Sequence, residues 1–427
     1  MNIAYLDPPY SRYFTQLCRK LNTSTGGRTV ALLSCPAYRL YARGDRSIVW
    51  QPGVSSVRHV LPEPFTRAAW ASHDERFAEA FSHAVEWFKE RFREEATDVC
   101  LLFSDARPFS TAAAIAAAHV GVVCLYFERG AFRLRTASLS TQGLNARFDL
   151  RLAARAGGML GLPDAAIPAR RREEPWLRAR FALFMLLNEL SCRWTPQRRP
   201  MQHKTYHFFN YVRIALRQFQ SEHPELLPAH GELAVDEVKG TVLLPLQLQT
   251  DSQFVMYSPF RHNQELLDFI VPRVCKSLPG ARVLVKKHPM DVRHYQLPAG
   301  AQFVGGNLSN YYHDAALMVC LNSGAGFEAA VQGKPVLCFA DSFYTGHLPV
   351  VRTSKANFVA DLLAAARRGD DPVSGAQLRA AVLRSYQAPG DVWAYTDDDL
   401  DASTGIVLQH IAAARALNGG ASDSASA

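Results

Sequence analysis

The stretch Val319-Cys-Leu-Asn-Ser-Gly-Ala-Gly-Phe-Glu-Ala-Ala-Val-Gln-Gly-Lys-Pro-Val-Leu-Cys-Phe339 decides the fold class of this chain. It joins an apolar run, small turn-forming residues from Asn322 to Gly326, a helical run over 327–332 and a second apolar run over 336–339. This order predicts strand, tight turn, helix and strand. In a parallel α/β sheet such a turn lies at the carboxyl end of a strand, where the first amides of the next helix bind anions. An ordinary turn followed by a surface glutamate has the same pattern, so both interpretations stay open.

Four residues of this stretch are candidate ligand contacts. Ser323, Gly324 and Gly326 keep the backbone free of bulk, so that a phosphate can approach closely. Glu328 follows about one turn inside the predicted helix, where its carboxylate can reach a ribose diol. The turn therefore predicts a site for a phosphate and a ribose.

Apolar runs alternate with helical patterns along the rest of the chain. Strands are expected over 2–6, 29–34, 99–104, 122–127, 241–246, 282–286, 317–321 and 336–339, and helices over 11–21, 68–95, 110–119 and 400–416. Ser110 is the expected cap of the third of these helices. Alternation of this kind predicts parallel sheets. Because 427 residues are many for one core, we expect an α/β protein with two Rossmann-like domains facing across a cleft.

The expected domain boundaries follow from the same alternation. Residues 1–164 form the first Rossmann-like domain and residues 236–390 the second. A mainly helical insertion, rich in basic and aromatic residues, lies between them over 165–235. Residues 391–417 form a C-terminal helical segment, and the small residues 418–427 form a disordered tail.

The net charge of +8 is concentrated in one part of the chain. Residues 165–217 hold eleven Arg or Lys against three acidic residues, with aromatic residues between them, so the remainder is neutral overall. This mixture is typical of membrane-surface helices and of nucleic-acid grooves. A helical subdomain with an aromatic core and solvated arginines is the alternative.

The cysteines and the hydropathy indicate the compartment. The eight cysteines are scattered without a Cys-x-x-Cys pair, which favours buried thiols in a reducing compartment. The chain begins without a signal-peptide pattern, and its longest nearly apolar run, 112–127, is too short to span a bilayer. These features predict a cytoplasmic protein.

Two carboxylates follow predicted strands. Glu128 lies just past a strand end with Gly130 behind it, and α/β proteins place functional acids at such positions. Asp251 follows the first strand of the second half. A turn or helix N-cap role explains Asp251 equally simply.

A histidine and a tyrosine complete the candidates. His288 ends another strand in a His-Pro turn beside Lys286 and Lys287, although a single strand-end histidine is more often structural. Tyr344 can face a base or a ribose, or simply pack. The sequence has no metal-ligand spacing, no Walker loop and no Gly-x-Gly-x-x-Gly.

Together these clusters resemble the capsule polysaccharide biosynthesis family of the KpsS/KpsC type. The matching motifs are Phe127-Glu-x-Gly130, Gly143-Leu-Asn-Ala146, Leu246-Gln-x-Gln-x-Asp-Ser-Gln253, Lys287-His-Pro289, Asn322-Ser-x-x-Gly-x-Glu-Ala329, Gly333-Lys-Pro-Val336 and Phe343-Tyr344. The resemblance implies a GT-B fold and a retaining β-Kdo transferase. Such enzymes move the sugar acid Kdo from CMP-Kdo to lysophosphatidylglycerol or a Kdo-primed lipid at the inner membrane.

The resemblance also implies residue roles. Asp251 would be the nucleophile and Glu128 a second active-site carboxylate, while His288, Ser323, Gly324 and Glu328 would form the CMP site. The further substrate-binding candidates are Gln247, Lys287, Pro289, Asn322, Gly326, Arg133, Asn145 and Tyr344. No metal and no cofactor beyond the donor substrate CMP-Kdo are implied.

Departures from the family pattern fall on the acceptor half. Arg133-Leu-Arg135 and Ser138-Leu-Ser140 replace the usual motifs there, so the acceptor stays open. The expected partners are a glycolipid acceptor, the anionic inner face of the inner membrane and capsule-assembly proteins. Nucleic acid is not expected, because no groove-reading motif accompanies the charge. A GT-B enzyme with another nucleotide sugar, and a non-catalytic lipid-binding capsule-assembly protein, are the alternatives.

Overall fold

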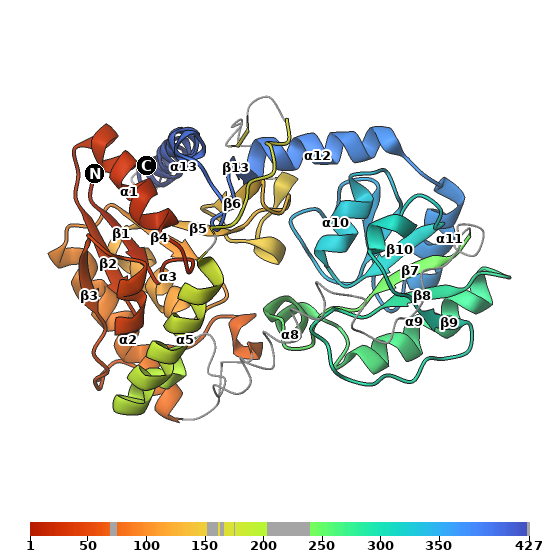
Figure 1. Cartoon of the computed structure of the whole chain (residues 1–427), viewed down its shortest axis with the longest axis horizontal. Coiled ribbons are helices and arrows are strands. Elements are labelled where there is room, and N and C mark those ends of the chain that lie inside the picture. The colour runs from red at the N-terminus through yellow and green to blue at the C-terminus, as the bar shows by residue number, and fades with distance from the viewer. Residues whose placement is uncertain (69–74, 152–160, 163–165, 175, 203–239, 425–427) are drawn as a thin grey trace. The chain divides into compact units, whose positions relative to one another are not determined.

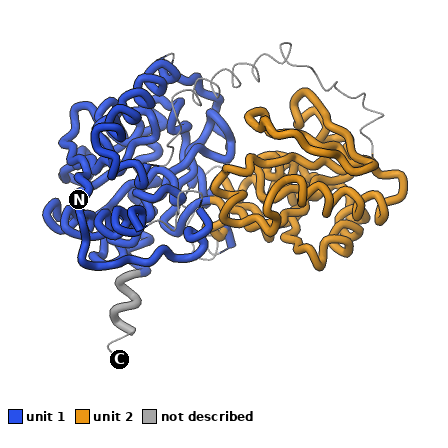
Figure 2. Tube along the Cα trace, turned by 90° about the horizontal axis from the view of Figure 1, so that it is seen from below, with its two compact units in different colours: residues 1–144, 150–208, 383–427 blue, residues 145–149, 209–382 orange. Residues whose placement is uncertain are grey.

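The computed structural model describes residues 1–68, 75–151, 161–162, 166–174, 176–202 and 240–424. The chain divides into two compact units (Figure 2). Unit 1 comprises Met1–Leu144, Leu150–Phe208 and Leu383–Ala427, and unit 2 comprises Asn145–Asp149 and Phe209–Val382.

Unit 1 is built on a seven-stranded sheet in the order β13-β6-β5-β4-β1-β2-β3 (Figure 1). The strands are β1 (Ile3–Leu6), β2 (Thr29–Leu33), β3 (Arg46–Val49), β4 (Val99–Phe103), β5 (Val123–Arg129), β6 (Thr136–Ser140) and β13 (Gln387–Pro389). Strands β1 to β5 are parallel, whereas β6 runs antiparallel to β5 and β13 antiparallel to β6. Every residue of β1 and β4 is buried, as the continuous apolar runs of a covered parallel sheet require.

The helices of unit 1 follow the apolar periodicity. They are α1 (Tyr13–Thr25), α2 (Glu75–Glu94), α3 (Pro108–Val120), α5 (Leu177–Trp194) and α13 (Asp397–Ser424), with 3-10 turns η1 (Pro36–Leu40), η2 (Phe65–Arg67) and η4 (Pro196–Met201). Helix α2 packs on α3, where the rings of Phe88 and Phe109 lie 4.6 Å apart. The expected cap at Ser110 is wrong. Arg107 is the N-cap and Pro108 opens the helix, because proline needs no amide partner in the first turn.

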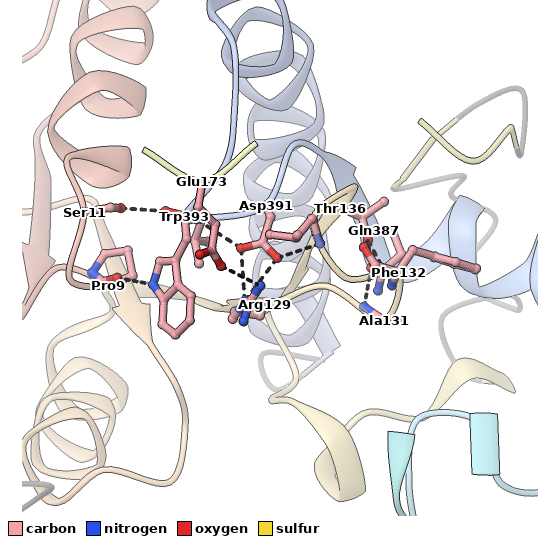
Figure 3. Close-up of polar contacts among 12 residues, drawn as sticks. Pro9, Ser11, Arg129, Ala131, Phe132, Thr136, Glu173, Gln387, Asp391 and Trp393 are labelled. Carbon is pink, nitrogen blue, oxygen red and sulfur yellow. Dashed lines mark hydrogen bonds and ion pairs between the residues drawn. The ribbon is translucent and has the colours of Figure 1, made fainter. Parts of the chain in front are cut away.

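The C-terminal segment returns to unit 1 and completes its sheet (Figure 3). The fully buried carboxylate of Asp391 accepts two hydrogen bonds from Nε of Arg129, at 3.1 and 3.2 Å. Trp393 stacks on that guanidinium and donates from Nε1 to the Pro9 carbonyl at 2.6 Å. Gln387 on β13 hydrogen-bonds to β6 and to the loop before it. These contacts explain why residues beyond 382 belong to unit 1 rather than to the second domain.

Unit 2 is built on a six-stranded, wholly parallel sheet in the order β12-β11-β10-β7-β8-β9. The strands are β7 (Val242–Pro245), β8 (Val283–Lys286), β9 (Ala301–Phe303), β10 (Leu317–Cys320), β11 (Val336–Cys338) and β12 (Val350–Arg352). The helices are α8 (Ser252–Tyr257), α9 (Asn263–Ser277), α10 (Gly324–Ala330), α11 (Phe358–Arg368) and α12 (Pro372–Tyr386), with 3-10 turns η3 (Asn145–Arg147) and η6 (Leu308–Tyr311). One continuous core joins β7, β8, β10 and β11 to α9 and α11.

The predicted α/β class with two parallel-sheet domains is confirmed. The structure corrects two details. Two antiparallel strands extend the first sheet, and the described part of the expected insertion, including α5, packs in unit 1 instead of forming a separate domain. Helix α13 is assigned through Ser424, since extending an existing helix avoids the cost of nucleation, and the disordered tail over 418–427 stays a prediction. The facing of the two domains across a cleft stays a prediction.

Two further expectations concern the whole chain. All eight cysteines are free thiols, and six of them are buried. No helix within the described ranges is long and apolar enough to cross a membrane. Residues 203–239, which include Lys204, Arg213 and Arg217 of the basic segment, lie outside the described residues.

Candidate functional site

Asp251 is the N-cap of α8 and lies at the carboxyl end of β7. Its Oδ1 accepts a hydrogen bond from the backbone N–H of Gln253 at 2.8 Å. The capping role that the sequence left open is therefore real. It does not consume the side chain, because a carboxylate has several acceptor positions and this one is only half-buried.

His288 lies within electrostatic reach of Asp251. Burial lowers the pKa of His288 below its usual 6.5, against the opposing effect of the Asp251 and Asp291 carboxylates. The ring is therefore neutral at pH 7. Because its Nδ1 accepts a hydrogen bond from the backbone N–H of Met290 at 3.1 Å, its proton lies on Nε2. His288 thus presents one fixed N–H donor, of the kind that binds a phosphate oxygen.

Three side-chain amides at the same edge of the sheet each keep an acceptor oxygen without a hydrogen-bond partner among the described residues: Gln247 Oε1, Asn263 Oδ1 and Asn322 Oδ1. Asn263 is fully buried and Asn322 is 7% exposed. Asn322 donates from Nδ2 to the Asp341 carbonyl at 2.9 Å and to Gln253 Oε1 at 3.3 Å, which fixes its orientation. Asn263 is too deeply buried to contact a ligand, whereas the orphaned acceptors of Gln247 and Asn322 suit the hydroxyl and amino groups of one.

The turn at 322–326 is built as predicted, but its glycines have different roles. Ser323 is the N-cap of α10, and its side chain accepts from the N–H of Gly326 at 3.3 Å. A Cβ on Gly324 would meet nothing, so that position is open. A Cβ on Gly326 would lie 2.6 Å from Tyr344 Oη. Gly326 is therefore required for packing rather than for ligand approach.

Tyr344 packs beneath this turn. Its ring is fully buried, and its hydroxyl donates to the Ser323 carbonyl at 2.7 Å. The assignment of Tyr344 as a direct substrate contact is therefore wrong, because no part of the ring is exposed. It supports the turn instead.

The remaining unit 2 candidates lie further out. Glu328 is exposed on α10, where its Oε2 accepts from the Tyr312 hydroxyl at 3.2 Å. Pro289 is exposed. Lys287 donates to the Arg293 carbonyl at 2.6 Å and lies near the Tyr295 ring, so it stabilises its own loop. Asn145, with a left-handed φ of 51°, begins η3, which contacts α8 in unit 2.

Unit 1 carries Glu128 at the end of β5, opposite Ser138 on β6. Gly130 is needed because a Cβ there would lie 2.1 Å from Thr136 Oγ1. Arg133 is exposed in the following loop, which leaves its guanidinium accessible. Glu128 and Asp251 belong to different units, and their meeting at one catalytic centre stays a prediction.

The sequence reasoning missed two charged residues near Glu128. Asp7 directly follows β1 and is 7% exposed, and Arg107, four residues after β4, is 6% exposed. Burial lowers the pKa of the Arg107 guanidinium, but Tyr10, Tyr38 and the Asp7 and Glu128 carboxylates outweigh this and raise it above its usual value. The sequence feature that could have identified them is a charged residue followed by proline, just past an apolar strand. It occurs at Asp7-Pro8 and at Arg107-Pro108.

The described residues contain no group of three His, Cys, Asp or Glu side chains placed to hold a metal ion. A family model described as "Capsule polysaccharide biosynthesis protein" matches residues 98–382. The chain belongs to this family. The matched span holds both candidate carboxylates and the whole turn at 322–326, which agrees with the resemblance drawn from the motifs.

Two curated relatives of this family member are similar over part of its length. The capsule polysaccharide export protein KpsS of Escherichia coli is 23% identical over 280 residues, covering 60% of this chain and 71% of KpsS. Protein FixF of Sinorhizobium fredii is 30% identical over 115 residues, covering 26% of this chain and 29% of FixF. The chain therefore spans less than a third of the length of FixF.

Solved structures with a similar fold include KpsC of Thermosulfurimonas dismutans, a beta Kdo 2,7 transferase. It is 13% identical with a TM-score of 0.41, covering 96% of this chain and 99% of KpsC. The UDP-GlcNAc 2-epimerase of Neisseria meningitidis is 11% identical with a TM-score of 0.33, covering 96% of this chain and 99% of the epimerase. Likeness at this level says nothing of what this family member binds.

Proposed function

We propose that this protein is a retaining β-Kdo transferase that moves Kdo from CMP-β-Kdo to a glycolipid in capsular polysaccharide linker synthesis. The observation that carries the proposal is the placement of Asp251, the N-cap of α8, within electrostatic reach of the oriented His288 ring at the carboxyl edge of the unit 2 sheet. A carboxylate beside a neutral N–H donor suits a nucleotide sugar whose phosphate leaves as a carbohydrate carbon is attacked. Membership in the capsule polysaccharide biosynthesis family supports the substrate class.

The reaction proceeds by double displacement. A carboxylate oxygen of Asp251 forms a bond to the anomeric carbon of Kdo while the bond from that carbon to the CMP phosphate oxygen breaks. The acceptor hydroxyl then attacks the same carbon and displaces Asp251, and its proton passes to Glu128 as the general base. Two inversions retain the β configuration.

The donor phosphate is placed over the turn at 323–326, with His288 as its second contact. The open position at Gly324 leaves room there, and Nε2–H of His288 donates to a phosphate oxygen. Glu328 accepts from the ribose hydroxyls. The oxygens of Gln247 and Asn322 supply acceptors for further donor groups of the nucleotide sugar.

Helix α5 provides the membrane contact of the proposed enzyme. Its inner face packs in unit 1 through Phe184 and Met185, which are buried. The apolar residues Leu183, Leu186, Leu187, Leu190 and Trp194, between 38% and 85% exposed, line its outer face at helical spacing. Arg178 and Arg193 are exposed on the same helix, and each basic residue near an anionic surface contributes about 1 kcal/mol. An amphipathic helix of this kind lies in the plane of a membrane surface.

Not all of the basic segment is free for that contact. Arg198 is buried and donates to Gln51 Oε1 at 2.9 Å, and Arg171 forms an ion pair with Asp399 at 2.7 Å. The membrane role therefore rests on the outer face of α5 rather than on net charge alone.

Mass spectrometry tests the proposal directly. The protein is incubated with CMP-Kdo and no acceptor, and we expect a Kdo-sized covalent adduct that is absent from Asp251→Ala. Products from CMP-Kdo and a panel of glycolipid acceptors identify the acceptor. An adduct that persists in Asp251→Ala moves the nucleophile to another residue, with Glu128 next. Transfer from CMP-sialic acid or a UDP-sugar, but not from CMP-Kdo, would show that the donor is a different nucleotide sugar.

A further inference from the structure

We infer that the carboxyl edge of the unit 1 sheet is a binding site for an anionic group, a phosphate or a carboxylate, and that the guanidinium of Arg107 is its main contact. The inference rests on the proposed function in one respect, since it assigns the anion to the acceptor. The anion site itself follows from the contacts of Arg107.

Arg107 is a nearly fully buried cation without hydrogen-bonded partners. Its side chain lies over the rings of Phe103 and Tyr10, with Cζ 4.6 and 5.3 Å from their centroids. Its Nε and Nη1 have no hydrogen-bond partner among the described residues. Ring stacking stabilises the face of a guanidinium but satisfies none of its N–H donors, which lie at its edge. Buried N–H donors without acceptors cost free energy, and the oxygens of an anionic ligand would satisfy them.

The Asp7 carboxylate supplies no hydrogen-bond acceptor to Arg107. Asp7 lies within electrostatic reach, yet its Oδ1 accepts from the backbone N–H of Ser34 at 2.8 Å, and within the described ranges it forms no ion pair with Arg107. Burial raises the pKa of Asp7 to about 6, so a second negative charge at this edge meets a carboxylate that can take up a proton. Glu128 also acts on Arg107 through space. The two acids hold the cation in place and leave its donors for a third anion.

The backbone around Arg107 is held in costly conformations. Asp7, Tyr10 and Ser104 have positive φ of 26°, 58° and 70°, and they follow β1 and β4, which are neighbours in the sheet. Each non-glycine residue in such a region costs on the order of 1–3 kcal/mol. These residues lie at the edge where α/β sheets bind ligands, and the Tyr10 ring lies over Arg107.

Aromatic side chains give the site its selectivity. Tyr10 is 8% exposed and contacts Tyr38 as well as Phe181 and Phe184 of α5. Ionic contacts are stronger in such a poorly solvated setting, whereas a neutral polar ligand gains little from it. The helix that carries the outer apolar face thus also borders the anion site. That arrangement suits an acceptor with a charged head and a lipid tail.

Two acceptor groups share this chemistry, a glycerophospholipid phosphate and the carboxylate of a terminal sugar acid. Calorimetry on the whole protein without a donor separates them, using sn-glycerol 3-phosphate and methyl β-Kdo glycoside as probes. Glycerol and the methyl ester of the glycoside are the uncharged controls. We expect the wild type to bind at least one anion more than about tenfold tighter than its uncharged partner.

Substitutions then locate the site. Arg107→Gln should lower the affinity for that anion about tenfold or more, and Arg107→Lys should fall between, because lysine keeps the charge but lacks the planar fork. Arg28→Gln, on an exposed arginine just before β2 at the opposite, amino edge of the same sheet, is the matched control and should bind normally. Circular dichroism verifies that each variant is folded. If Arg107→Gln unfolds, the site is tested by Arg107→Lys and by comparing the affinity of the wild type for the charged and uncharged probes.

Each outcome has a defined meaning. Binding of the phosphate probe alone assigns the lipid headgroup, and binding of the glycoside alone assigns the sugar acid. The site is rejected if the wild type binds neither anion, if it does not discriminate charged from uncharged probes, or if folded Arg107 variants bind like the wild type. If the wild type binds the anion but transfers no Kdo from CMP-Kdo to any acceptor, the proposed function is rejected. The anion site would still stand.

Discussion

The carboxyl edges of the two sheets carry opposite kinds of chemistry. In unit 2, Asp251 and His288 are half-buried beside side-chain amides with spare acceptors. In unit 1, Arg107 and Asp7 are almost fully buried, and two aromatic rings lie over Arg107. The same position in an α/β sheet thus gives an open polar edge in one unit and a dry charged edge in the other.

This difference follows from the residues that cover each edge. Tyr10, Tyr38 and the buried residues of α5 cover the unit 1 edge, so a charge there is poorly solvated and its ionic contacts are strengthened. The unit 2 edge offers several neutral contacts of modest strength, which suits a nucleotide sugar with many polar groups. We propose that the first edge selects a charge and that the second places a reacting carbon.

The largest effect tests whether Asp251 is more than a helix cap. Asparagine caps a helix as well as aspartate does, so Asp251→Asn should leave the stability of the protein unchanged. It cannot attack the anomeric carbon, and we expect turnover to fall by about a thousandfold or more with CMP affinity kept. Asp371→Asn, at the start of α12, is the matched control. Near-normal turnover of Asp251→Asn would show that Asp251 serves only as a helix cap. The acids at both sheet edges would then have structural roles alone.

The next effect tests the dryness of the unit 1 edge. Burial raises the pKa of Asp7 from 3.8 to about 6, so the folded protein holds this proton to a higher pH than the unfolded chain does. The free energy of unfolding should therefore fall as pH rises from about 4 to about 6, by roughly 3 kcal/mol at most. Asp7→Asn keeps an oxygen for the Ser34 amide and removes this loss.

Urea unfolding of the wild type and Asp7→Asn at about pH 4.5 and about pH 7.5 measures this loss of stability. The free energy of unfolding of the variant, relative to that of the wild type, should be greater at the higher pH. Asp401→Asn, whose side chain is 64% exposed, is the control and should show no such pH-dependent gain. Equal stability of Asp7→Asn and the wild type at both values would mean that the unit 1 edge is hydrated like the unit 2 edge.

A smaller effect tests the neutral donor of unit 2. His288→Ala should weaken CMP binding about tenfold, the value of one hydrogen bond to a charged group. His294→Ala, on an exposed histidine of the same segment, should bind normally. Because burial lowers the pKa of His288, its ring should titrate below pH 6.5 in NMR spectra, and CMP affinity should change little above that pH. Unchanged affinity in His288→Ala would place the phosphate elsewhere.

The smallest effect concerns the helix that covers the dry edge. Leu187→Gln or Leu190→Gln should reduce binding to phosphatidylglycerol vesicles roughly fivefold each, from about 1 kcal/mol of lost apolar burial. Val373→Gln, an exposed valine on α12, is the control. Vesicle flotation should also weaken with salt, because the arginines contribute through screened charges. Flotation that is independent of anionic lipid and of salt would remove the membrane role.

The sequence predicted the parts of the fold that depend on local pattern. Apolar runs located β1, β2, β4, β5, β7, β8, β10 and β11 to within a few residues. The turn at 322–326 was also predicted, since small residues between a strand and a helix specify it locally. Strand β13 was missed, because its short polar sequence becomes a strand only by pairing with β6, where Gln387 contacts Ser138 across 249 positions.

The same distinction between local pattern and tertiary contact applies to the candidate site residues. Residue type and position past a strand were enough to single out Asp251, His288 and Ser323. They could not show that Tyr344 is buried, that Gly326 serves packing, or that Arg107 lacks a partner, because each of these depends on which distant side chains fill the surrounding space.

By itself the sequence determined the α/β class, the family motifs and the chemistry available at the strand ends, since these follow from hydrophobic periodicity and from the identity of side chains. Tertiary structure alone decided which of those side chains are solvated, stacked or left without partners. Burial sets the pKa of Asp7 and of His288 and the cost of an unpaired Arg107. In each unit, burial is the sum of contacts between segments far apart in the chain, and no local stretch of sequence contains it.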